Sequence, residues 1–517
     1  MVTPRYLGDW AALTPDKPAV IDAASGAVLS YRELDERSNR LAQLLHAQGL
    51  RRGERIAIVA ENHPRYFEVA WAALRSGLLL AAVNRYQTAD EVAYVIADSD
   101  ARVVISTLKM AELAAQITDC MPGVERRLMI DTTIPGWESY ESAVAAFPAE
   151  RLAEEWAGGT MLYSSGTTGR PKGIVRAQAG ERITDAAYYD TRMTLPRRFG
   201  FDADTVYLST APLYHAAPLN YATVPQLCGG TVVLMARFDA LQALQLIERH
   251  RVTHATWVPT MFIRLLKLDE AERRRFDLSS QRAAIHAAAP CPVEVKRRMI
   301  EWWGPIVHEY YGGTEGNGLT LIGSATALQR PGSVGRAVVG TLHICDDDGR
   351  ELPTGEDGIV YFERDALPFH YHKDEAKTRA AQHPQQPTWT AIGDIGHLDA
   401  DGYLYLTDRR SFTIISGGVN IYPQAIEDAL ALHPSVADAA VIGIPDAEMG
   451  EAVLAVIEPA TGVAPGPALA EQLAAFLRGK VARYMLPRAI EFIDRMPRLP
   501  TGKLYKRALR ERYAKAA

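Results

Sequence analysis

The strongest constraint on the fold is the alternation of helix-like and strand-like patterns in the first half of the chain. Residues 31–50, YRELDERSNRLAQLLHAQGL, place apolar side chains at helical spacing. They are followed by the strand-like RIAIVA at 55–60 and the helix-like RYFEVAWAALRSG at 65–77. The short apolar runs ARVVIS, TVVLMA and THATWV are typical of buried parallel strands. This alternation predicts a layered α/β fold.

The pattern changes in the second half of the chain. From about Gly340 the sequence predicts short strands joined by turns, and after Arg410 it predicts a compact unit of about 100 residues with helix, strand, helix and a basic tail. The length of 517 residues and the 48% of hydrophobic residues are enough for several cores. We therefore expect a large N-terminal body at 1–410, with layered sheets and helices in several subdomains, and a small, mobile α+β domain at 411–517.

Charge and cysteine content exclude several classes of partner. The formal net charge is −6, which gives no general attraction to nucleic acid or to an acidic membrane. The longest apolar window, YFEVAWAALRSGLLLAAV, is interrupted by Glu68 and Arg75, so we expect no integral membrane segment. The spacing of the four cysteines fits neither a disulfide framework nor a zinc site. We expect buried, reduced thiols in a cytoplasmic protein.

A polar loop from Tyr163 to Gly173 reads YSSGTTGRPKG. Its glycines let backbone N–H groups approach an anion, its hydroxyls donate hydrogen bonds, and Lys172 adds a positive charge. The alternative is a solvated surface linker. A P-loop of the Walker type is excluded, because Pro171 stands where the glycine before the lysine would be required. The loop predicts a local phosphate-binding site.

The loop is similar to one found in the adenylate-forming superfamily, which includes acyl- and aryl-CoA synthetases, luciferases and peptide-synthetase adenylation domains. Further motifs of that family follow in its order: YYGGTEG at 310–316, IGDIGHLDADGYLYLTDRR at 392–410, ISGGVNIYPQAIE at 415–427 and PRLPTGKLYKR near the C-terminus. On this ordered set the chain resembles an acyl-CoA synthetase. The resemblance implies ATP, Mg²⁺ and coenzyme A as cofactors.

The resemblance also implies roles for individual residues of the body. Glu315 would bind Mg²⁺, Thr314 would contact the α-phosphate, Asp394 would accept the ribose hydroxyls with Arg409 in support, and Tyr311 and Ala288 would flank the adenine. Around the β- and γ-phosphates the resemblance places Ser165, Thr167, Thr168, Gly169 and Lys172. In the segment HAAAP, Ala287 stands where relatives often have glycine.

For the small domain the resemblance implies two functions. Lys503, in PTGK, would neutralise charge at the α-phosphate during adenylation. After a rotation of the domain, Gly417 and Gly418 would line the pantetheine tunnel. The chain departs from the family at the hinge, where Ser411 replaces an aspartate or lysine and Phe412 replaces an acidic residue. This leaves the electrostatic control of the hinge open.

The acid-binding pocket is the least constrained part of the prediction. His215, in PLYHAAPLN, matches a gate near the acid's carboxylate, and Trp257, Met261 and Phe262 are candidates for an apolar lining or for core packing. We expect an ATP-dependent acyl-CoA ligase for a hydrophobic monocarboxylic acid. The alternatives are an enzyme with a carrier-protein thiol or another acceptor, and a catalytically inactive nucleotide-binding relative. The expected partners are small molecules: a carboxylic acid, ATP and coenzyme A. The protein could also form a homodimer.

Overall fold

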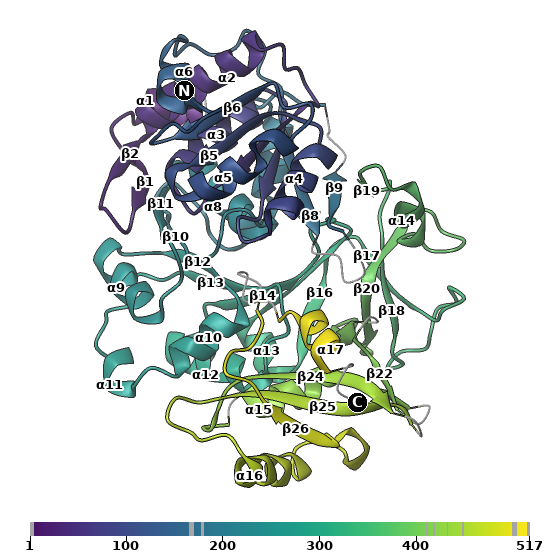
Figure 1. Cartoon of the computed structure of the whole chain (residues 1–517). Coiled ribbons are helices and arrows are strands. Elements are labelled where there is room, and N and C mark those ends of the chain that lie inside the picture. The colour runs from purple at the N-terminus through teal and green to yellow at the C-terminus, as the bar shows by residue number, and fades with distance from the viewer. Residues whose placement is uncertain are drawn as a thin grey trace. The chain divides into compact units, whose positions relative to one another are not determined.

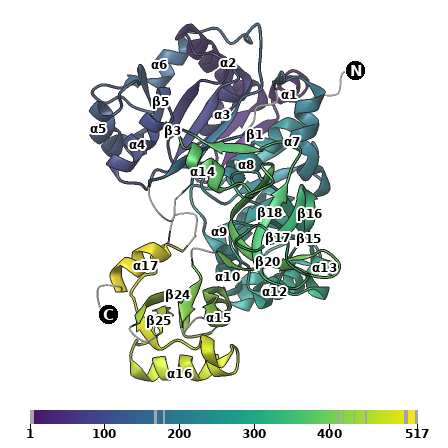
Figure 2. The same cartoon turned by 90° about the vertical axis from the view of Figure 1, so that its right-hand side faces the viewer.

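The computed structural model describes residues 5–164, 170–176, 180–409, 412–416, 419–431, 433–446, 449–498 and 504–513. The chain forms two compact units. The first comprises Met1–Thr256, Glu270–Ile285 and Pro368–Thr378, and the second comprises Trp257–Asp269, His286–Leu367 and Arg379–Ala517. Figures 1 and 2 show helices and strands in both units, as the sequence predicts for an α/β protein.

An eight-stranded sheet forms the centre of the first unit (Figure 1). Its strands run in the order β19 (Phe369–Tyr371), β9 (Lys172–Arg176), β8 (Gly159–Ser164), β4 (Leu79–Val83), β3 (Arg55–Val59), β5 (Ala101–Thr107), β6 (Arg126–Ile130) and β7 (Glu138–Ser139). The strands from β8 to β7 pair in parallel, whereas β9 and β19 are antiparallel to their neighbours. One face packs against α4 (Ala89–Asp98) and α5 (Ala111–Ile117) through a buried cluster that includes Val59, Val83 and Ile96. The predicted buried parallel strands are confirmed.

A second group of strands in this unit has the order β13 (Ala283–His286), β12 (His254–Trp257), β10 (Val206–Ser209), β11 (Thr231–Leu234), β1 (Pro18–Asp22) and β2 (Val28–Ser30). The other helices of the unit are α1 (Leu7–Leu13), α2 (Tyr31–Ala47), α3 (Arg65–Arg75), α6 (Tyr140–Ala145), α7 (Ala186–Arg198), α8 (Ala216–Cys228), α9 (Ala240–His250), α11 (Glu270–Arg273) and α14 (Glu375–Ala380). Helix α2 begins at a capping box in which Ser30 and Glu33 bond each other's backbone N–H groups. This cap fixes the start of the helix predicted at 31–50.

Antiparallel hairpins dominate the second unit. The strand order is β17 (Thr341–Cys345), β18 (Gly358–Glu363), β20 (Trp389–Leu398), β21 (Leu404–Arg409), β16 (Ser333–Val339), β15 (Leu319–Gly323) and β14 (Val307–Tyr311). Its helices before residue 410 are α10 (Pro259–Leu266), α12 (Val293–Trp303) and α13 (Ser324–Gln329). The short strands and turns predicted after Gly340 are therefore present.

The C-terminal residues of this unit build a smaller α+β layer. Its sheet contains β22 (Ile414–Ser416), β23 (Val419–Ile421), β24 (Val436–Asp446), β25 (Gly450–Pro459) and β26 (Ala489–Phe492). Alternate residues of β24 face opposite sides. Val441 joins the core with α15 (Pro423–Ala431) and α16 (Pro467–Arg478), and Ile442 joins the core with α17 (Lys506–Tyr513), in line with Figure 2. The expected small α+β domain is confirmed, whereas the boundary at 410/411 lies outside the described residues and stays a prediction.

The structure corrects one cysteine prediction. Cys228, Cys291 and Cys345 are buried free thiols, as expected, but Cys120 is exposed at the end of a short 3-10 turn. The described part of the chain contains no helix that combines the length and apolarity needed to cross a membrane.

Candidate functional site

Several predicted site residues lie outside the described part of the chain. They are Ser165, Thr167, Thr168 and Gly169 of the phosphate loop, Ser411 of the hinge, Gly417 and Gly418, and Lys503. The others are divided between the two units: Lys172 and His215 belong to the first, and Ala288, Tyr311, Thr314, Glu315, Asp394 and Arg409 belong to the second.

Asp394 is the centre of the group in the second unit. It lies on β20 directly opposite Arg409 on the antiparallel neighbour β21. Its Oδ1 is 3.0 Å from Nε of Arg409, and its Oδ2 accepts a hydrogen bond of 2.7 Å from the hydroxyl of Tyr311. The side chain of Asp394 is 8% exposed. The strand register thus brings together three residues that the sequence analysis assigned to the ribose and the adenine.

Electrostatics keep the two partners of Asp394, Arg409 and Tyr311, in defined protonation states. The carboxylate of Asp394 raises the pKa of the Arg409 guanidinium, which therefore stays charged. Burial, followed by the negative charge of Asp394, raises the pKa of the Tyr311 phenol well above its ordinary value. Tyr311 therefore stays a neutral donor, and its hydrogen bond helps to orient the carboxylate of Asp394. A buried, pre-oriented carboxylate can bind a pair of neighbouring hydroxyl groups.

Glu315 lies in the tight connection between β14 and β15, and it is 9% exposed. Two glycines of this connection, Gly313 and Gly316, flank Glu315. Gly316 has a φ of 65°, which is the left-handed region. A Cβ at Gly313 would lie 2.6 Å from Cδ1 of Ile392 and 2.9 Å from Oε2 of Glu315. The backbone therefore passes directly beside the carboxylate, and the half-buried Thr314 lies between these residues.

The oxygen atoms near Gly313 suit a Mg²⁺ ion. A Cβ at Gly313 would lie 3.7 Å from Oδ1 of Asn317, a buried oxygen that has no hydrogen-bond partner among the described residues. Carboxylate and amide oxygens are the hard ligands that Mg²⁺ prefers. The described part of the chain does not gather three His, Cys, Asp or Glu side chains into a metal site. Since protein-bound Mg²⁺ commonly takes only one or two carboxylates and completes its shell with phosphates and water, the residues fit this ion.

Ala288 follows β13 and adopts a φ of 76° although it carries a Cβ. The left-handed region costs a residue other than glycine about 1 kcal/mol. Next to it, His286 is fully buried, and burial lowers the pKa of its imidazole well below the ordinary value. Ala288 itself is exposed. A strained, exposed residue at the end of a buried strand is the kind of backbone that functional sites retain.

The candidates for an apolar lining form an aromatic cluster. The ring centroids of Trp257 and Phe262 are 6.1 Å apart, and those of Trp257 and Trp303 are 5.1 Å apart. Phe262 is fully buried and Met261 is 7% exposed. The structure therefore places Phe262 in the core, which is the second of the two interpretations that the sequence left open.

In the first unit, His215 is the N-cap of α8. The loop before it is held by Asn62, whose Oδ1 accepts from the backbone N–H of Leu213 at 2.9 Å and whose Nδ2 donates to the carbonyl of Ala211 at 3.1 Å. The ring of Tyr214 lies 4.2 Å from the imidazole of His215. Asn62 was not among the predicted site residues, because no local sequence pattern links it to this loop.

Lys172 is at the first position of β9, where its Nζ lies 3.0 Å from Oδ2 of Asp374. The hydrogen bond to Asp374 raises the pKa of the Lys172 amine, so the side chain stays a cation. Asp374 was not among the predicted site residues, because the phosphate-loop motif at 163–173 does not by itself indicate a partner for Lys172.

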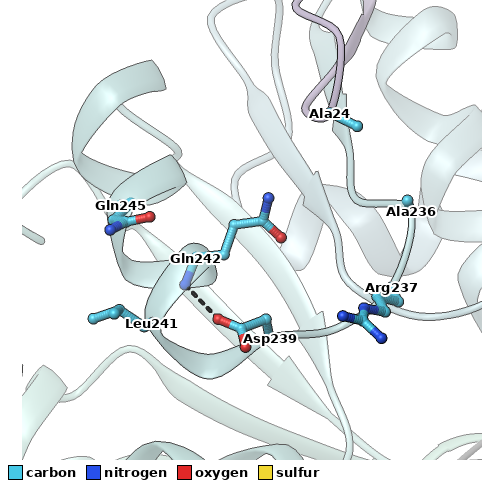
Figure 3. A pocket seen from close by; sticks show the side chains of 7 residues that line it. All are labelled: Ala24, Ala236, Arg237, Asp239, Leu241, Gln242 and Gln245. Atoms are coloured by element: carbon cyan, nitrogen blue, oxygen red, sulfur yellow. Dashed lines mark hydrogen bonds between the residues drawn. The ribbon is translucent and has the colours of Figure 1, made fainter.

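One cavity of the first unit, of about 420 Å³, lies apart from these residues (Figure 3). Figure 3 shows Asp239 capping α9 through the backbone N–H of Gln242, at 2.8 Å. The cavity is lined by Ala24, Ala236, Arg237, Asp239, Leu241, Gln242 and Gln245. No predicted site residue is among them.

Comparison with known proteins identifies the family of this chain. A family model for AMP-binding enzymes matches residues 7–370, and a model for the AMP-binding enzyme C-terminal domain matches residues 425–503. The chain therefore belongs to the AMP-binding enzyme family, within the adenylate-forming superfamily.

Individual relatives match along the whole chain. A feruloyl-CoA synthase of Amycolatopsis sp is 32% identical over 515 residues, which cover 98% of this chain and 99% of that protein. The fatty acid–[acyl-carrier-protein] ligase ScoC of Streptomyces coeruleorubidus is 32% identical over 506 residues, covering 96% and 94%. The crystal structure of the anthranilate CoA ligase AuaEII with anthranoyl-AMP superposes with a TM-score of 0.84 at 25% identity, covering 100% of this chain and 99% of that chain.

Proposed function

We propose the following reaction for this chain, resting on its full-length similarity to acid–CoA ligases. The protein is an AMP-forming acid–CoA ligase that uses ATP, Mg²⁺ and coenzyme A. An oxygen of the acid's carboxylate attacks the α-phosphorus of ATP, the bond from that phosphorus to the bridging oxygen breaks, and pyrophosphate leaves with the electron pair. The thiol of coenzyme A then loses its proton to water and its sulfur attacks the acyl carbon, the bond from that carbon to the phosphate oxygen breaks, and AMP leaves with the electron pair.

The residues of the second unit bind and orient the nucleotide in this proposal. Asp394 accepts the ribose hydroxyls, Arg409 and Tyr311 hold its carboxylate in place, and Ala288 contributes to the adenine site. Thr314 contacts the α-phosphate. Glu315 would hold Mg²⁺, which when bound supplies positive charge that neutralises the phosphate oxygens.

The remaining roles rest on the family resemblance. Lys172 binds the β- and γ-phosphates together with Ser165, Thr167, Thr168 and Gly169. His215 lies at the acid's carboxylate. Lys503 neutralises charge at the reacting phosphate, and Gly417 and Gly418 line the path of the pantetheine arm. We further propose that residues 1–410 and 411–517 move relative to each other between the two half-reactions.

We propose a hydrophobic acid, with aryl acids as the first class to test. Feruloyl-CoA synthase and an indoleacetate–CoA ligase of Aromatoleum aromaticum, the latter 31% identical over 520 residues, support this choice. The experiment is to supply ATP, Mg²⁺, CoA and a panel of acids and to detect AMP, pyrophosphate and thioester. Formation of ADP and phosphate instead would contradict the reaction class. Efficient turnover of amino acids would contradict the proposed pocket.

A second acceptor is supported by one relative. ScoC transfers a fatty acid to an acyl-carrier protein, as its name states, and it is as similar to this chain as the feruloyl-CoA synthase is. A carrier-protein thiol is therefore the alternative to coenzyme A. Comparing kcat/KM for CoA with that for a phosphopantetheinylated carrier protein decides between the two.

Compartment and assembly complete the proposal. We propose the cytoplasm, because the four free cysteines suit a reducing compartment. For assembly we propose a homodimer, to be tested by light scattering at several protein concentrations.

A further inference from the structure

The ammonium group of Lys172 has an internal partner in this structure. Its Nζ lies 3.0 Å from Oδ2 of Asp374, with the two side chains 33% and 21% exposed. The neighbouring cation Arg170 lies over the ring of Tyr94, with its guanidinium carbon 4.9 Å from the ring centroid. Both described cations at the C-terminal end of the phosphate loop are therefore held by the protein itself.

Asp374 is rigidly positioned. Its Oδ1 accepts a hydrogen bond of 2.9 Å from the backbone N–H of Lys377, in the first turn of α14, while Oδ2 faces Lys172. Its carbonyl accepts from the hydroxyl of Thr378 at 2.9 Å, and that hydroxyl accepts from the backbone N–H of Tyr371 at 2.9 Å. One carboxylate oxygen therefore orders the helix, and the other is presented to Lys172.

The segment before Asp374 is fixed to the sheet of the first unit. Strand β19 runs antiparallel to β9, with Tyr371 opposite Ile174, and the backbone N–H of His372 donates to the carbonyl of Gly173. Two side chains of the segment then bind Asp100, in the turn between α4 and β5: Nζ of Lys373 is 2.7 Å from Oδ1 of Asp100, and Nε2 of His372 is 3.1 Å from Oδ2 of Asp100. The pairing of β19 with β9 therefore brings Asp374 close to Lys172.

We propose that Asp374 is a positioning residue that competes with the phosphates of ATP for the ammonium group of Lys172. This inference rests on the proposed phosphate-binding role of Lys172. Without nucleotide, Asp374 holds the ammonium at the start of β9. A triphosphate carries more negative charge than one carboxylate, so it displaces Asp374 when it binds. When pyrophosphate forms, Asp374 competes for Lys172 again, which weakens the binding of the departing pyrophosphate.

The test is the affinity of the full chain for ATP and for pyrophosphate, measured by calorimetry. Asp374→Asn keeps the acceptor for Lys377 but removes the charge that pairs with Lys172. Because partly exposed ion pairs are weak, both ligands should bind about two- to fivefold more tightly. Adenosine, which has no phosphate, should bind as in the parent. Asp374→Ser, which also caps a helix, should reproduce the result if Asp374→Asn does not fold.

Two further variants distinguish a failure of the proposed competition from a failure of the proposed phosphate-binding role of Lys172. Asp100→Asn removes a carboxylate from the same network but not from Lys172, and asparagine tolerates the φ of 56° at this position, so ATP affinity should not change. Lys172→Met should weaken ATP binding and abolish any effect of Asp374→Asn. If Lys172→Met binds ATP normally, the phosphate-binding role of Lys172 is wrong. The proposed competition is wrong if Lys172→Met weakens ATP binding but Asp374→Asn alone does not tighten it. It is also wrong if Asp374→Asn tightens ATP binding by the same factor in the Lys172→Met background.

Discussion

Asp394 and Arg409 are direct cross-strand partners on β20 and β21, and their side chains form an ion pair with Nε 3.0 Å from Oδ1. Tyr311 binds the second oxygen of the same carboxylate. Arg409 and Tyr311 thus hold both oxygens of the Asp394 carboxylate in a fixed orientation. The pair therefore connects the strand register directly to the proposed ribose site.

Asp394→Asn should raise the KM for ATP by about ten- to a hundredfold, because a hydrogen bond to a charged acceptor contributes about 1.5–3 kcal/mol. The KM for the acid should change much less. Steady-state kinetics with each substrate varied in turn measures both values.

The matched control is Asp357→Asn. The carboxylate of Asp357 binds His397 of β20 at 2.8 Å and Thr407 of β21 at 2.7 Å, so it bridges the same strands without contacting Arg409. An equal rise in the KM for ATP in both variants would show that Asp394 acts on the sheet and not on the nucleotide.

Gly313→Ala should displace the carboxylate of Glu315, since the new methyl group would lie 2.9 Å from its Oε2. We expect the Mg²⁺ concentration for half-maximal adenylation to rise by about tenfold, a change of about 1.4 kcal/mol. Titration of pyrophosphate formation against Mg²⁺ at saturating ATP measures this shift.

Gly323→Ala is the control for that variant, because it alters the same β14–β15 hairpin at its other end. A Cβ there would lie 3.5 Å from Nδ1 of His308, which is an ordinary contact. Its Mg²⁺ dependence should match that of the parent. A parental Mg²⁺ dependence in Gly313→Ala would contradict the proposed role of Glu315.

The sequence predicted the β and α elements well, because helical and strand periodicities are local. The resemblance to the adenylate-forming superfamily implied that Asp394 and Arg409 belong to one site, and in the structure the two residues are cross-strand partners. The sequence did not predict Asp374 or Asn62. Their partners, Lys172 and Leu213, come close only through the packing of distant segments.

Phe412, at the predicted hinge, is another residue whose surroundings the sequence did not predict. It stands where the family usually has an acidic residue, and this left the electrostatic control of the hinge open. In the structure the Phe412 ring lies 5.1 Å from Nζ of Lys506. Lys506 also pairs with Glu427 at 2.8 Å. The aromatic ring thus supplies a partner for a cation through a cation–π contact, which a comparison of charges alone does not reveal.

Ala288→Gly should relieve the left-handed strain at this position. The gain of about 1 kcal/mol is opposed by about 0.5–1 kcal/mol of extra chain entropy in the unfolded state, so stability should stay equal or rise slightly. The control is Ala289→Gly. Ala289 is the next residue and does not have a positive φ, so this substitution has only the entropic cost and should lower stability. Denaturant unfolding of both variants measures the difference. Equal losses of stability would show that Ala288 is not strained.

Asp428 should make the stability of the protein depend on pH. Burial raises the pKa of its carboxyl to about 7 in the folded state, whereas an unfolded aspartate has a pKa of about 3.9. Between these values the folded state retains a proton that the unfolded state releases. The free energy of unfolding therefore falls as pH rises, by up to about 1.4 kcal/mol per pH unit, and the loss is complete above pH 7.

Asp428→Asn removes this titration and keeps an acceptor for the amide of Gln424, which lies 2.7 Å from Oδ1 in the parent. The difference in unfolding midpoint between variant and parent should increase in favour of the variant from pH 5 to pH 8. Two neighbouring carboxyls, Glu427 and Asp408, also have pKa values raised by burial, and their negative charges raise the pKa of Asp428 further. A difference that is constant with pH would exclude a raised pKa at Asp428.

Lys503→Ala should separate the two half-reactions. Loss of one positioned charge from the transition state costs about 3–4 kcal/mol, so formation of acyl-AMP should slow by about a hundred- to a thousandfold. With acyl-AMP and CoA supplied, thioester formation should proceed near the parental rate, because the proposal assigns Lys503 to the first step only. Gly418→Leu should show the reverse, since a side chain in the pantetheine path would block transfer and spare adenylation.

Lys480→Ala tests whether any lysine of the small domain has this effect. Its ammonium group lies 5.8 Å from the centroid of the Phe476 ring, and no role in the reaction is assigned to it, so both half-reactions should keep their rates. Rapid-quench measurement of acyl-AMP and thioester in the three variants distinguishes the steps. If Lys503→Ala slows both steps alike, or if Gly418→Leu leaves transfer intact, one domain does not serve the two half-reactions in two orientations.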